Sequence, residues 1–111
     1  MEVSTKALAR VTLVTLRGRV DHDTSPQLTQ SLNDLLRSHT NNIVVDLSGV
    51  DYISSAGLRA LLMAHKETQG KHHGDVRLAA PPALVTETLK LVGFDKIFKI
   101  YPDVVEAVGS F

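Results

Sequence analysis

Two kinds of apolar pattern alternate along the chain, and together they predict an α/β fold. Runs rich in β-branched and aliphatic residues, which are typical of strands, occur at 11–20, 43–45, 76–79 and 97–101, with a weaker run at 3–9. Between them, apolar residues recur at helical spacing. This order predicts a four- to five-stranded mixed sheet with about four helices packed mainly on one face.

Each predicted helix begins at a recognisable start signal and continues as an apolar stripe. The start signals are Thr24 or Ser25 with Pro26 and Gln27, Ser54 or Ser55, Pro81-Pro82, and Pro102. The stripes are Leu28, Leu32, Leu35 and Leu36; Leu58, Leu61, Leu62 and His65; Leu84, Val85, Leu89 and Val92; and Val104, Val105 and Val108.

The connections between these elements are short. The Ile-Val-Val run at 43–45 is typical of a strand covered on both faces, and residues 46–50 are expected to leave it through a turn. Residues 67–75 are expected to form one polar loop, in which His72-His73 is a solvated pair. Gly93 is expected to stop the third helix. Because no linker or low-complexity tract divides the chain, residues 1–111 are expected to form a single domain.

Composition narrows the function classes. The chain has 12 Lys and Arg against 12 Asp and Glu, so no net charge favours nucleic acid or an anionic membrane. It has no cysteine, which excludes disulfides, thiolate metal sites and a cysteine nucleophile. The first residues contain no apolar signal-peptide core, and no apolar run is long enough to cross a bilayer. The expected location is therefore cytoplasmic.

Two polar segments follow predicted strands and precede predicted helices, at 21–25 and 54–57. In α/β sheets such positions usually carry function. The hydroxyls of Ser54 and Ser55 lie at a helix start, where unpaired N–H groups and the helix dipole favour an added anion such as phosphate. Gly57 would allow close approach of a docking molecule. A pair of capping serines without further function remains the simpler interpretation of these residue types alone.

The other candidate sites, which contain histidine, carboxylate or serine side chains, are less specific. Asp21-His22-Asp23 is open to three interpretations: a solvated loop, a partner-docking surface or a metal site, although no further ligand lies at helical spacing from it. His65 is expected to be a partly buried, hydrogen-bonded residue at the edge of the core. A hydrolase elbow is disfavoured because Ile53 stands where that turn needs glycine.

Three segments of the chain resemble the STAS domain family, which includes the bacterial anti-sigma factor antagonists. The longest, 45–62, reads Val-Asp-Leu-Ser-Gly-Val-Asp-Tyr-Ile-Ser-Ser-Ala-Gly-Leu-Arg-Ala-Leu-Leu. It is similar to the family pattern of an apolar strand, Asp-Leu, an aromatic, an apolar residue and Asp-Ser-Ser/Thr-Gly-Leu. Gly-Arg-Val-Asp at 18–21 and Leu-Lys-Leu-Val-Gly-Phe-Asp-Lys-Ile-Phe at 89–98 resemble two further family segments. Their order and spacing make the resemblance specific.

The resemblance implies a regulatory binding protein, not an enzyme, with no cofactor or metal. It places the phosphoacceptor on Ser55, with Ser54 as the alternative. It implies that the unphosphorylated chain binds an anti-sigma factor that is also a serine protein kinase. This binding releases the sigma factor. Phosphorylation ends this binding, and a serine phosphatase acts on Ser55. The implied partner-binding residues are Asp21, His22, Asp23, Thr24, Ser54, Ser55, Ala56, Gly57 and Arg59.

Two positions depart from the family pattern. Ser54 replaces the frequent Asp before the acceptor, and Ala56 replaces the second hydroxyl residue. Alternatives therefore stay open: a STAS adaptor or scaffold in a phosphatase- or secretion-linked switch, a stressosome-like complex or a transporter, or a small ligand- or nucleotide-binding module.

Overall fold

A computed structural model describes residues 1–38, 40–72 and 74–111. In this part of the chain, five strands form one sheet in the order β1-β2-β3-β4-β5, with β1 antiparallel to β2 and the other neighbours parallel. The predicted mixed α/β sheet is confirmed. The strands are β1 Glu2–Ala7, β2 Thr12–Val20, β3 Asn42–Ile53, β4 Asp75–Ala79 and β5 Ile100–Tyr101. The helices are α1 Ser25–Arg37, α2 Ser55–Glu67, α3 Ala83–Leu91 and α4 Val104–Gly109.

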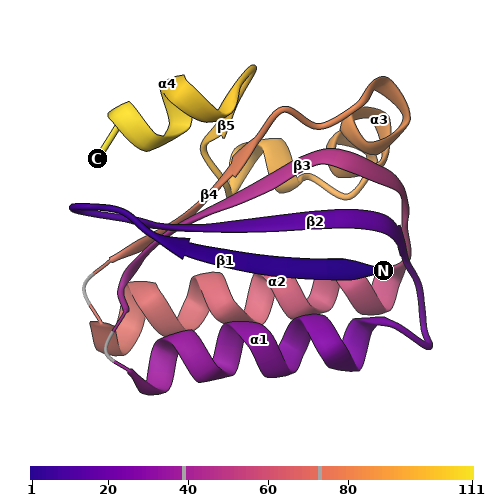
Figure 1. Cartoon of the computed structure of the whole chain (residues 1–111). Helices are drawn as coiled ribbons and strands as arrows, with labels where there is room; N and C mark the ends of the chain where they lie inside the picture. Colours follow the sequence, from indigo (N-terminus) through magenta and orange to yellow (C-terminus); the bar gives the residue numbers. More distant parts are fainter. Residues whose placement is uncertain (39, 73) are drawn as a thin grey trace.

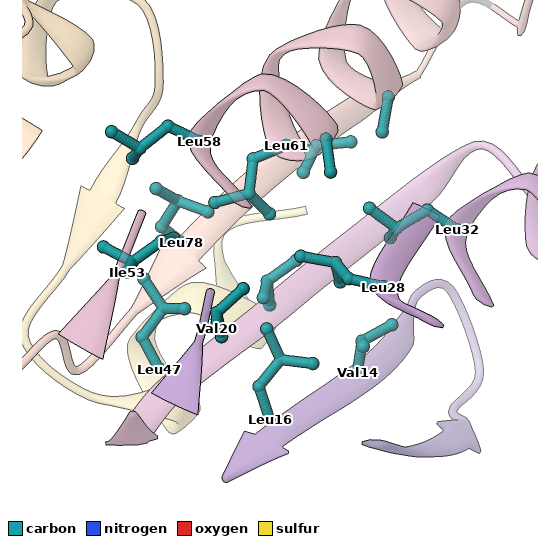
Figure 2. Close-up of a cluster of buried hydrophobic side chains, with 14 of the residues drawn as sticks. Val14, Leu16, Val20, Leu28, Leu32, Leu47, Ile53, Leu58, Leu61 and Leu78 are labelled. Carbon is teal, nitrogen blue, oxygen red and sulfur yellow. The ribbon is translucent and has the colours of Figure 1, made fainter. Parts of the chain in front are cut away.

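Helices α1 and α2 lie side by side under one face of the sheet, whereas α4 lies on the opposite face (Figure 1). Figure 2 shows the main core, where α1 and α2 leucines such as Leu28 and Leu61 meet the inward side chains Leu16 and Leu78 of the sheet. All four are fully buried. Burial of this kind is the main stabilising contribution to a small domain.

The smaller cluster on the other face explains the uninterrupted apolar run of β3. Val44 packs there with Ala79 of β4 and Ala107 of α4, while its neighbours Ile43 and Val45 belong to the main core. The expectation that residues 43–45 are covered on both faces is therefore confirmed.

The predicted turn at residues 46–50 is wrong. Strand β3 continues to Ile53, and its pairing with β2 shifts register between Thr15 and Arg17 and again between Gly18 and Arg19. The residues expected to form the turn lie in this irregular part of the strand, where the Ser48 N–H donates a 2.9 Å hydrogen bond to the Asp46 carboxylate. In a turn these residues would lose backbone hydrogen bonds that pairing with β2 provides, so the strand is favoured.

Other element boundaries also differ from the sequence expectations. The last strand is only Ile100–Tyr101, because residues 94–96 form a 3₁₀ turn. The expected polar loop begins as a continuation of α2, a π-helical turn over Thr68–His72, in which Thr68 is buried. His73 of the expected His pair lies outside the described residues. Gly93 does follow α3 with a positive φ of 78°, as a helix stop requires.

His65 lies at the core edge as expected, but without the expected hydrogen bond at its buried Nδ1. Its side chain is 13% exposed, and its ring centroid is 4.7 Å from that of Phe98. Nδ1 is 3.4 Å from the Asp75 carboxylate, yet the geometry is not that of a hydrogen bond. The same carboxylate accepts a 2.9 Å bond from the Arg77 guanidinium.

None of the described helices combines the length and apolar character needed to cross a membrane.

Candidate functional site

The two polar segments singled out in the sequence meet at the carboxyl end of the parallel strands β2 and β3. Val20 and Ile53 are the last paired residues of these strands. One residue further, the Ser54 N–H donates a 2.7 Å hydrogen bond to the Val20 carbonyl. The loop that leads into α1 and the start of α2 are therefore held next to each other by the sheet.

The two serines at the start of α2 have different environments. Ser54 is the N-cap residue, and its hydroxyl oxygen accepts a 3.2 Å hydrogen bond from the Gly57 N–H. Ser55 is the first helical residue and is exposed. Within the described part of the chain no hydrogen bond involves its hydroxyl. Of the two candidate caps, Ser54 thus performs the local structural role, and Ser55 presents its hydroxyl to solvent.

Gly57 faces inward, which differs from the role expected for it. It is buried, and a Cβ built on it would lie 2.6 Å from Cγ1 of Val20 and 3.0 Å from Cγ1 of Ile53. The absence of a side chain therefore lets the first turn of α2 lie against the ends of β2 and β3. This close packing fixes the first turn of α2, which carries Ser55.

The loop before α1 is organised by Asp21. Its carboxylate accepts 3.0 Å hydrogen bonds from the Asp23 and Thr24 N–H groups. The Thr24 hydroxyl accepts a 2.8 Å bond from the Asp21 N–H, and its single proton faces both the Arg19 carbonyl and the Asp21 carboxylate. Thr24 occupies the N-cap position, but its side chain accepts no hydrogen bond from the first helical N–H groups. Ser25 is buried and its hydroxyl donates to the His22 carbonyl, so neither side chain forms the predicted cap.

These contacts have an electrostatic consequence for Asp21. The pKa of Asp21 is held below its usual value chiefly by the hydrogen bond from the Thr24 N–H. Hydrogen bonds from the Thr24 hydroxyl and the Asp23 N–H, and the nearby charge of Arg19, also lower this pKa, whereas partial desolvation raises it. The Arg19 Nε lies 3.7 Å from the Asp21 carboxylate. Asp21 is therefore an ionised, fixed charge beside the start of α2.

Two residues of this surface were not among those expected from the sequence. Arg19 at the end of β2 places its guanidinium carbon 4.3 Å from the ring centroid of Tyr52 at the end of β3. Tyr52 is 43% exposed. The family-like pattern includes an aromatic at position 52, but its partner becomes visible only when the register of β2 and β3 is known.

The remaining predicted residues lie in the same two segments, the loop before α1 and the start of α2. His22, Asp23 and Arg59 are exposed, and Ala56 is partly buried. Arg59 lies one helical turn after Ser55, on the same side of α2. Among the residues that the structure describes, no three His, Asp or Glu side chains are grouped as a metal site would require.

A shallow apolar depression adjoins this surface. It lies between the end of β3 and α3, where Tyr52 and Ile53 face Leu84 and Leu91. Leu84 is 70% exposed and Leu91 is 86% exposed. Leu84 belongs to the apolar stripe predicted for the third helix, but of the α3 residues only Val85 and Leu89 are buried.

The arrangement defines a small mixed-sheet α/β domain that presents a serine hydroxyl at the start of its second helix, beside an ordered acidic loop. The STAS domain model matches residues 2–107, and the chain belongs to this family.

Among the relatives found, a protein named as an anti-sigma factor antagonist, BtrV of Bordetella bronchiseptica, is 28% identical over all of this chain and 95% of its own. The anti-sigma-F factor antagonist RsfB of Mycobacterium tuberculosis is 25% identical over 88% of this chain and 79% of its own. Among solved structures, an anti-sigma factor antagonist from Mycobacterium paratuberculosis superposes with a TM-score of 0.89 at 27% identity, covering 98% of this chain and 92% of its own.

Proposed function

We propose that this protein is an anti-sigma factor antagonist whose binding is switched by phosphorylation of Ser55. In the unphosphorylated form it binds an anti-sigma factor that is also a serine protein kinase, and the sigma factor is released. Phosphorylation of Ser55 ends this binding, and a serine phosphatase restores it. One observation carries the proposal: Ser54 is engaged as the helix cap, whereas the neighbouring Ser55 is exposed. The names of the relatives support the kind of partner.

The start of α2 suits a reversible phosphate. A phosphoserine adds about −1.5 to −2 charges at neutral pH. The positive end of the helix dipole and the free N–H groups of the first turn stabilise such a charge. Arg59, four residues further along the helix, can also reach it. The fold is therefore expected to stay the same, and the switch acts on the docking surface.

The docking surface already carries negative charge on its other side. Asp21 is held ionised by its hydrogen bonds, and the exposed Asp23 follows it. A phosphate on Ser55 would add to this charge, draw Arg59 away from the partner and require desolvation on docking. Loss of one buried charged pairing at an interface costs about 2–5 kcal/mol, which corresponds to at least a thirtyfold loss of affinity.

The partner and the modification are tested together by purifying the protein from its native cells. Mass spectrometry should find phosphate on Ser55, and a serine kinase should copurify with the unphosphorylated form. Recovery of neither under several growth conditions would contradict the proposal and favour the adaptor or transporter alternatives.

Variants then test the switch by calorimetry with the copurified kinase. Ser55→Asp should bind at least thirtyfold more weakly than the wild type. Ser55→Ala should bind normally and resist phosphorylation. Ser54→Ala is the matched control: it should remain a substrate, and phosphorylation that depends on Ser54 but not on Ser55 would overturn the assignment.

A further inference from the structure

Strand β1 forms a regular, open edge of the sheet. It pairs with β2 over six consecutive residues, from Glu2 opposite Arg17 to Ala7 opposite Thr12, with no register shift. No other described strand lies on its outer side. It contains no proline, and all of its residues except Val3 are exposed. Such an edge is a template for pairing with another strand.

The hairpin bond fixes which backbone groups point outward. The Leu8 N–H donates a 2.8 Å bond to the Val11 carbonyl, so these two residues are a hydrogen-bonded pair. Because such pairs alternate along an antiparallel ladder, residues 2, 4 and 6 direct their N–H and C=O groups toward β2. Val3, Thr5 and Ala7 direct theirs away from the sheet.

The side chains of β1 are arranged symmetrically about Ser4. Glu2 and Lys6 lie two residues on either side of it and carry opposite charges. They share one face of the sheet with Ser4, because successive side chains alternate. This is the face opposite the main core, since Val3 packs against that core.

We propose that this strand is a self-association edge, at which a second copy of the chain pairs its own β1 antiparallel about a twofold axis at Ser4. In this register Val3 and Thr5 exchange backbone hydrogen bonds with Thr5 and Val3 of the other copy. Glu2 then faces Lys6 of the other copy at a non-hydrogen-bonded position, where side chains approach most closely. Both contacts occur twice, and the two sheets become one ten-stranded sheet.

Charge complementarity selects this register over its neighbours. A shift of the axis to Thr5 places Lys6 opposite Ser4, and a shift to Val3 places Glu2 opposite Ser4. Both alternatives keep outward backbone groups opposite each other, but neither pairs opposite charges. The same twofold places the Glu2 end of one strand beside the Lys6 end of the other. Since the start of β1 pairs with the end of β2, the end that leads to Ser55, this twofold places the two Ser55 sites at opposite ends of the combined sheet.

Sedimentation equilibrium of the full chain at low salt, from micromolar to millimolar concentration, tests the proposal. The wild type should show a monomer–dimer equilibrium. Glu2→Lys and Lys6→Glu should each weaken it about tenfold, because two attractive contacts become repulsive. The double variant Glu2→Lys/Lys6→Glu should restore it, as should an equimolar mixture of the two single variants. The control Lys96→Glu, at an exposed position away from β1, should have no effect.

A backbone variant tests the pairing independently of charge. Thr5→Pro removes an outward N–H without removing a bond to β2, so circular dichroism should remain that of the folded domain while the dimer is lost. A wild type that is monomeric throughout the concentration range overturns the proposal. So does a dimer that survives Thr5→Pro in a folded chain, and charge variants that fail to complement each other overturn the register.

Discussion

The Ser54 N–H donates a hydrogen bond of 2.7 Å to the carbonyl oxygen of Val20, and this bond joins the start of α2 to the end of β2. It extends the parallel pairing of β2 and β3 by one step beyond Ile53. Two loops separated by about thirty residues in the sequence thereby become one surface. The position of Ser55 relative to Asp21 depends on this extension of the sheet.

Gly57 should not tolerate a side chain. Gly57→Val is expected to lower the free energy of unfolding by about 1–3 kcal/mol, because its Cβ would overlap Val20. Denaturant unfolding measures this change. Gly70→Val is the control, since a Cβ there meets no atom within 4 Å. Equal destabilisation of both variants would show that the close packing at Val20 is unimportant.

The two adjacent serines should differ in their contribution to stability. Ser54→Ala should cost about 1 kcal/mol through loss of the helix cap, and Ser54→Asp should retain most of the stability because Asp is an equally good cap. Ser55→Ala should change stability by less than about 0.5 kcal/mol, as at ordinary surface positions. Thermal unfolding of the three variants checks this order. A reversed order would assign the cap to Ser55.

Asp21 should make stability depend on pH in the acid range. Hydrogen bonds, chiefly from the Thr24 N–H, lower its folded-state pKa, whereas an unfolded Asp titrates near about 3.9. Its contribution is therefore complete well above pH 4, declines as the pH falls through these two values, and is absent below the folded pKa. Chemical denaturation from pH 7 to pH 2 should show a smaller decline for Asp21→Asn than for the wild type. Identical profiles would exclude Asp21 as a contributor.

Truncation of two leucines of α3 should affect the stability of the domain to very different extents. Leu89 is fully buried, and Leu89→Ala is expected to cost about 2–5 kcal/mol. Leu84 is 70% exposed, so Leu84→Ala should change stability by less than about 0.5 kcal/mol. Denaturant midpoints measure both. If Leu84→Ala reduced binding of the copurified kinase while stability was unchanged, the apolar depression beside Tyr52 would belong to the docking surface.

Local sequence signals predicted the elements that depend on local chemistry. The stripe of Leu28, Leu32 and Leu36 predicted α1 and its buried face. Gly93 predicted the end of α3, and in the structure it has the positive φ that a helix stop requires. The Ile-Val-Val run predicted a strand covered on both faces. In each case the pattern and the environment agree because the residue's own conformational preference or apolar surface decides the outcome.

The sequence by itself determined the α/β order, the apolar face of α1 and the family-like serine segment. Only the tertiary structure decided that β3 runs through Ser48 and Gly49, that Ser54 caps α2 while Ser55 stays exposed, and that Gly57 faces Val20. These outcomes depend on the pairing of β3 with β2, which joins residues about thirty positions apart. Backbone hydrogen bonds along that pairing override the local turn preference, and no short-range pattern records them.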